Sequence, residues 1–190
     1  MAKITWAAKS VGDTFTAANA NEIRTAVNGT TMTPSTVITA TVASVTSAIH
    51  QTGDIIKTTI VVDLIGAKSV ATLLDVIGDT GACHFGQITT AVNGVIVAGQ
   101  VGCAIVPTTG ANDIDIFSST AADGAYDADA SGLAGAKALV TSAGAYAIGT
   151  VKPFTLLPAA DDYLYLASGV ATAGTYDAGT IIIEMWGTAA

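Results

Sequence analysis

Apolar and polar residues alternate with a period of two through much of the chain after residue 36. Residues 113–117 read Asp-Ile-Asp-Ile-Phe and residues 163–166 read Tyr-Leu-Tyr-Leu, a pattern typical of strands with one buried face. Residues 57–64 form a β-branched run that ends before Gly66, as strands often do. About nine or ten such segments, with no long amphipathic helix between them, predict an all-β sandwich or barrel. We take a jelly-roll-like β-sandwich as the expected fold class.

Two connections between the predicted strands are informative. Asn93-Gly94 lies between predicted strands at residues 85–90 and 95–98, and Asn-Gly is a strong signal for a hairpin turn. We therefore expect these two strands to pair as a hairpin. The longest break is residues 118–137, which are rich in Ala, Asp and Gly and are expected to form an exposed loop.

Residues 1–35 follow a different pattern. Thr16 is suited to cap a short helix, and Asn28-Gly29 is suited to end it about three turns later. Such a short helix is not stable alone in water, so it must dock on its own domain or on another chain. The sequence thus predicts an N-terminal attachment arm over residues 1–35 and a β-sandwich domain over residues 36–190. The partner-binding residues expected in the arm are Trp6, Phe15, Ile23 and Val27.

Charge and hydropathy narrow the class of partner. The chain has 7 basic and 15 acidic residues, a net charge of −8, and no basic cluster that would neutralise phosphates. Nucleic acid and anionic membranes are therefore not expected partners. The mean hydropathy is +0.57, but no apolar stretch approaches the ~20 residues of a spanning helix. The start also lacks the apolar run of a secretory signal, so we expect synthesis in a cytoplasm and reduced thiols at Cys83 and Cys103.

The shortage of charge favours assembly. Only 12% of the residues are charged, against roughly 25% in an ordinary soluble domain. Interface cores are depleted in charge in the same way, so a homo-oligomer, most simply a trimer, is expected over an acidic monomer. Trp6 and Trp186 fit anchoring against a neighbour, because Trp is enriched at interfaces. Trp186 fits the core of its own domain equally well.

Catalytic and metal-binding signals are weak. The two histidines, His50 and His84, lack zinc-ligand spacing, and no nucleophile elbow or phosphate-binding loop is present. We expect no cofactor and no enzyme activity, although His50, His84 and Asp63 would be the residues to examine for a site assembled from distant positions.

One acidic cluster lies in the long predicted loop. Asp123, Asp127 and Asp129 are close enough in sequence to share a calcium ion. They lack the order of an EF-hand loop, so a solvated acidic loop is the favoured interpretation, with calcium binding left open.

The N-terminal sequence also carries a family resemblance. From residue 11 it reads VGDTFTAANANEI, which resembles the opening G-D-x-F-T-A-x-x-x-N-E-I of structural proteins of tailed bacteriophages, including tail-fibre and head-fibre chains. Much of the remainder is similar to small virion proteins of marine and cyanobacterial phages, at residues 52–64, 85–89, 113–117, 157–160 and 163–166. The resemblance implies an attachment segment and a place in the virion after synthesis in the host cytoplasm. It brings no catalytic residues.

Two functions compete within this class. A capsid decoration (cement) protein would trimerise and lie on the head lattice, with its arm across the phage major capsid protein. A tail-fibre or host-recognition protein would join tail or baseplate proteins and present residues 118–137 to a cell-surface glycan. Decoration is favoured, because Tyr126 is the one aromatic residue in that loop and no fixed-period repeat of a fibre shaft is present. A major capsid protein is disfavoured because the chain lacks a long helical pattern.

Overall fold

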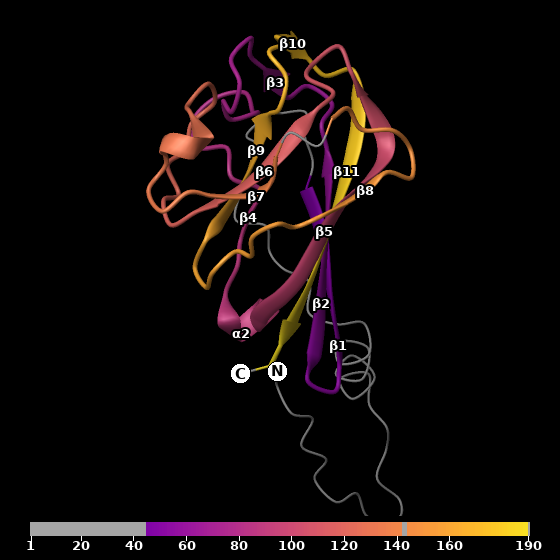
Figure 1. The fold of residues 1–190 in the computed structure, drawn as a ribbon, viewed down its shortest axis with the longest axis vertical. Helices are drawn as coiled ribbons and strands as arrows, with labels where there is room; N and C mark the ends of the chain where they lie inside the picture. The colour runs from indigo at the N-terminus through magenta and orange to yellow at the C-terminus, as the bar shows by residue number, and fades with distance from the viewer. Residues whose placement is uncertain (1–44, 142–143, 190) are drawn as a thin grey trace, which may run out of the picture.

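The computed structural model describes residues 45–141 and 144–189. The predicted arm, with Trp6, Phe15, Ile23 and Val27, lies outside the described residues. Within them the protein is mostly antiparallel β-sheet, which confirms the all-β class (Figure 1). The elements are β1 Val45–Thr52, β2 Ile55–Asp63, β3 Lys68–Ser69, β4 Gly86–Gln87, α2 Thr90–Asn93, β5 Val95–Thr108, β6 Ile114–Ser119, the 3-10 turn η1 Ala130–Gly132, β7 Lys137–Val140, β8 Val151–Pro153, β9 Tyr163–Ser168, β10 Gly174–Thr175 and β11 Ala178–Thr188.

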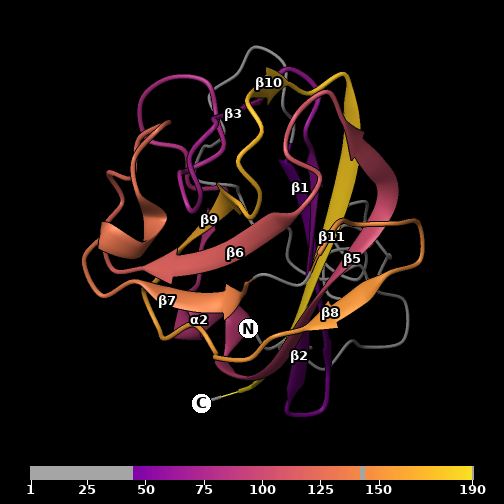
Figure 2. The same ribbon diagram turned by 45° about the horizontal axis from the view of Figure 1, so that its top comes forward.

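Most of the strands form two sheets. One has five strands in the order β1-β2-β11-β5-β8, and the other has four in the order β4-β9-β6-β7. In Figure 2 the long strands β2, β5 and β11 run steeply through the view, and β6 and β7 of the second sheet run across it beside them, on the left. β3 and β10 make a separate two-stranded pair. β8 carries Pro153 at the edge of its sheet, where no further strand needs a backbone donor.

The main hydrophobic core contains residues of both sheets. In β11, Ile181, Ile183 and Met185 are fully buried, while the residues between them are half-exposed, so one face of the sheet packs inward. Ile116 of β6 and Leu164 of β9 belong to the same core. Burying such side chains contributes about 1.5–3 kcal/mol each and holds the sheets together.

The predicted hairpin at Asn93-Gly94 is wrong. β4 and β5 lie in different sheets, and Asn93 ends the helical turn α2 between them. The Asn93 side chain accepts a hydrogen bond from Thr89 N–H at 2.9 Å and donates one to Thr58 Oγ1 at 3.0 Å. Gly94 has a φ of 70° and closely approaches the backbone of Thr188. Asn-Gly therefore ends a helical turn here and does not form a hairpin. The hydrogen bonds of the Asn93 side chain to Thr89 and to Thr58 of β2 stabilise that turn.

No helix in the described part of the chain is long and apolar enough to cross a membrane.

Candidate functional site

The five-stranded sheet has one face that is turned away from the main core. We call it the outer sheet face and define it by the outward residues of the long strands, such as Val61 of β2 and Ile182 and Trp186 of β11. Trp186 is half-buried and lies on the side opposite the buried Met185. Trp186 is thus not part of the core between the sheets.

A polar cluster crosses this face beside Trp186. Lys57 Nζ lies 2.5 Å from Glu184 Oε1 and 5.5 Å from the centre of the Trp186 ring. Gln100 Nε2 donates a hydrogen bond to Glu184 Oε2 at 2.8 Å. The hydrogen bond from Lys57 lowers the pKa of Glu184, which outweighs the effect of partial burial. The cluster joins β2, β11 and β5, so it orients the Trp186 ring on the surface.

Exposed apolar residues surround the polar cluster. Cross-strand pairing places Ile55 and Val95 beside Thr188, and Ile105 beside Thr180, on the same side as Trp186. The charged side chains of the described strands on this face are Lys57, Asp63 and Glu184. The large apolar residues that are about half exposed include Ile55 at 45%, Val95 at 54%, Ile105 at 51% and Val151 at 55%. A face of this composition suits contact with another protein surface.

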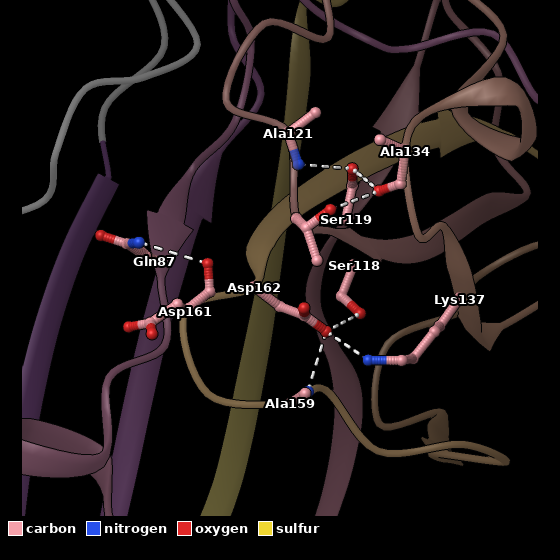
Figure 3. Close-up of polar contacts among 10 residues, drawn as sticks. Gln87, Ser118, Ser119, Ala121, Ala134, Lys137, Ala159, Asp161 and Asp162 are labelled. Atoms are coloured by element: carbon pink, nitrogen blue, oxygen red, sulfur yellow. Dashed lines mark hydrogen bonds and ion pairs between the residues drawn. The ribbon is translucent and has the colours of Figure 1, made fainter.

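The second candidate surface is the loop between β6 and β7, residues 118–137. Asp162, just before β9, closes its base (Figure 3). Asp162 Oδ2 accepts hydrogen bonds from Ser118 Oγ at 2.9 Å, Lys137 Nζ at 2.8 Å and Ala159 N–H at 2.8 Å. Burial alone raises the pKa of Asp162, but Lys137 and the two other donors lower it below its usual range. Ser118 and Lys137 are also cross-strand partners, so one carboxylate holds both ends of the loop.

The loop is also fixed above its base. Ser119 Oγ donates to Ala134 O at 2.8 Å and accepts from Ala121 N–H at 3.0 Å, as Figure 3 shows. Tyr165 Oη donates to Ala121 O at 2.6 Å and accepts from Gly124 N–H at 3.3 Å. Burial raises the pKa of Tyr165 to about 12, so its hydroxyl stays protonated and remains a donor. These hydrogen bonds tie the loop to β6 through Ser119 and to β9 through Tyr165.

The three loop carboxylates do not form a metal site. Asp129 Oδ1 accepts hydrogen bonds from Ser131 N–H at 2.8 Å and Ser131 Oγ at 2.6 Å, which lower its pKa. Asp123 and Asp127 are exposed. Among the described residues, no group of three or more His, Cys, Asp or Glu side chains is placed to hold a metal ion. Tyr126 is half-buried against the smaller core around Val76.

The other residues considered for chemistry are far apart. His50 pairs with Lys57 across β1 and β2, and Asp63 lies six residues farther along β2, about 20 Å away at ~3.3 Å per residue. His84 is buried against Tyr163, with ring centres 4.9 Å apart, and burial lowers its pKa. The structure does not bring His50, His84 and Asp63 together. Cys83 and Cys103 are both buried free thiols.

Comparison with known proteins gave no match: no protein-family model fits the chain, and no curated protein or solved structure is significantly similar to it.

Sequence reasoning missed the side chains that organise these surfaces. Asp162 follows another aspartate, and its spacing from Ser118 and Lys137 shows no pattern. Lys57 and Glu184 are 127 positions apart in a chain of 190 residues, so only the pairing of β2 with β11 brings them together. The one local signal was alternation, which places Lys57, Thr59 and Val61 on one side of a strand.

Proposed function

We propose that this chain is a structural protein of a bacteriophage virion, a capsid decoration protein that stabilises the head lattice. The observation that carries the proposal is the outer sheet face, with Trp186 at its polar cluster and half-exposed apolar residues around it. Such a face, with few charges and an oriented aromatic side chain, matches the composition of protein interfaces. Its occupant in this proposal is a second copy of the chain, in a homotrimer.

The order of the strands supports the finer fold proposed here, a jelly-roll β-sandwich. Without β1, the two sheets have the orders β2-β11-β5-β8 and β4-β9-β6-β7. Along the chain each successive strand of these eight changes sheet, except from β6 to β7. This alternation is typical of an eight-stranded jelly roll, an architecture of viral capsid and lectin domains. One fold can serve many functions, so the strand order is compatible with a capsid protein but does not identify one.

The proposed mechanism is mechanical. Copies of the domain associate through the outer sheet face, and the arm, with Trp6, Phe15, Ile23 and Val27, binds the phage major capsid protein. Contacts that form only on the assembled shell stabilise that shell by mass action. No step needs catalysis, a cofactor, nucleic acid or a membrane.

The position of the chain in the virion tests the proposal. Gold-labelled antibody against the chain is applied to intact particles, with antibody to an unrelated protein as the control. Decoration predicts gold distributed over the whole head in electron micrographs. Gold confined to the tail, or no gold on any particle, contradicts the proposal.

A tail-fibre or host-recognition protein is the second candidate. The observation that favours it is the loop at residues 118–137. Asp162 and Tyr165 hold this loop in place through hydrogen bonds, and a surface that recognises a ligand needs a loop that is held in this way. Its one aromatic residue, Tyr126, is half-buried, whereas glycan sites use exposed aromatic faces. Gold confined to the tail tip would favour this function, and loss of host adsorption by variants of Asp123 and Asp127 would support it.

A further inference from the structure

A lysine and an aspartate are buried side by side between the two sheets. Lys152 of β8 is 6% exposed, and its Nζ lies 3.5 Å from Oδ1 of Asp113, which directly precedes β6. The Tyr146 ring packs against the amine, with its centre 3.6 Å from Nζ. Gly144 holds the pair in position: its carbonyl accepts a hydrogen bond from Nζ, and its N–H donates to Asp113 Oδ2 at 3.1 Å.

A second carboxylate lies beside the pair. Asp115 is 1% exposed, and a Cβ built at Gly169 would lie 3.0 Å from both Asp113 Oδ1 and Asp115 Oδ1. The carboxylates of Asp113 and Asp115 therefore both lie against Gly169. Gly169 leaves room for both, because any side chain there would collide with them.

Burial disfavours the charged form of Lys152. Burial lowers the pKa of Lys152, although the nearby Asp113 opposes that shift. Taking an ammonium and a carboxylate out of water is costly for each ion, and their attraction offsets that cost only with excellent geometry. Proton transfer within the pair gives an amine and a carboxylic acid, and a neutral lysine amine is a nucleophile.

We propose that Lys152 and Asp113 condense to form an intramolecular isopeptide bond that covalently joins the two sheets. Nζ lies 3.5 Å from Asp113 Oδ1, which is bonded to Cγ, so the amine is held beside the carbon that it would attack. Lys152 is in β8 of the five-stranded sheet and Asp113 directly precedes β6 of the four-stranded sheet, so the bond would link the two sheets.

The chemistry needs no external reagent. Nζ of Lys152 attacks Cγ of Asp113, the new C–N bond forms, and the C–O bond to the carboxyl hydroxyl breaks. The hydroxyl leaves as water with one proton from the amine, so the product is an amide and one water molecule. Gly144 N–H stabilises the charge that develops on Oδ2 during attack. Asp115 is placed to carry the amine proton to the leaving hydroxyl.

Intact-protein mass spectrometry of the denatured full chain tests the proposal. The folded wild-type protein should weigh about 18 Da less than its sequence, and fragment ions should show a branched peptide joining Asp113 to Lys152. Lys152→Arg keeps the positive charge but forms no such amide, so it should have its full sequence mass. Asp113→Asn should lose ammonia instead, about 17 Da, which identifies the atom that leaves.

Two controls separate this bond from other causes of water loss. A succinimide at Asp123-Gly124 would also lose water, but mild base hydrolyses it, whereas the isopeptide bond survives. Asp115→Asn should form the isopeptide bond more slowly, so that the chain keeps its full mass for longer after folding. Bond formation at the wild-type rate would contradict the role of Asp115 in proton transfer. Wild-type protein that is folded by circular dichroism and still has its full sequence mass overturns the proposal, whether or not the variants fold.

Discussion

Replacing Asp162 by Ala should destabilise the domain by about 3 kcal/mol. The substitution removes the acceptor shared by Ser118, Lys137 and the Ala159 N–H. The hydroxyl of Ser118 is fully buried and loses its partner, and an orphaned buried donor costs about 1–3 kcal/mol. The Lys137 side chain is 35% exposed, so solvent screening limits its ion pair to less than about 1 kcal/mol.

Thermal unfolding followed by circular dichroism measures this effect. For a chain of this size, a loss of about 3 kcal/mol lowers Tm by roughly 10 °C. Asp161→Asn is the matched control, because that neighbouring side chain is exposed and the substitution should change Tm little. In a double-mutant cycle, Ser118→Ala should cost about 1 kcal/mol less in the Asp162→Ala background than in the wild type. A wild-type Tm for Asp162→Ala, or no coupling to Ser118, would refute the assigned role of the carboxylate.

Three other predictions concern the pKa of Asp162, the packing at Gly124 and the outer sheet face. Because the folded-state pKa of Asp162 is lowered, its stabilisation is fully present above the unfolded value of ~3.9 and is lost as the pH falls through the folded value. Denaturant unfolding from pH 6 down to acid should therefore show a smaller decrease in the free energy of unfolding for Asp162→Asn than for the wild type. Gly124→Ala should destabilise the domain by about 1–3 kcal/mol in the same assay, because the added Cβ would lie 2.6 Å from Tyr165 Cε1; an unchanged midpoint would contradict this packing. Ile182→Glu together with Trp186→Ala should convert the wild-type oligomer to monomers in light scattering, with a Tm close to that of the wild type; a monomeric wild type would argue against the outer sheet face as a contact between copies in solution.

Two residues show where sequence patterns were ambiguous. Trp186 fitted a core or an interface equally well, and its strand register places it on the outer sheet face opposite Met185. Asn93 fitted a hairpin, but its side chain bonds Thr89 and Thr58, so the dipeptide ends a helical turn. In both cases the local preference is compatible with two structures, and contacts with residues far away in sequence decide between them.

The sequence by itself determined the all-β class. The physical reason is local, because β-branched runs and period-two alternation favour strands. The prediction of one buried face for residues 113–117 and 163–166 was wrong: β6 and β9 are buried on both faces, because other segments pack on each side of them. Only the tertiary structure decided which strands are neighbours, because many pairings satisfy the same alternation. For that reason the Asp162 cluster and the buried pair of Lys152 and Asp113 had no signal in the sequence: each joins segments that meet only when the sheets pack together.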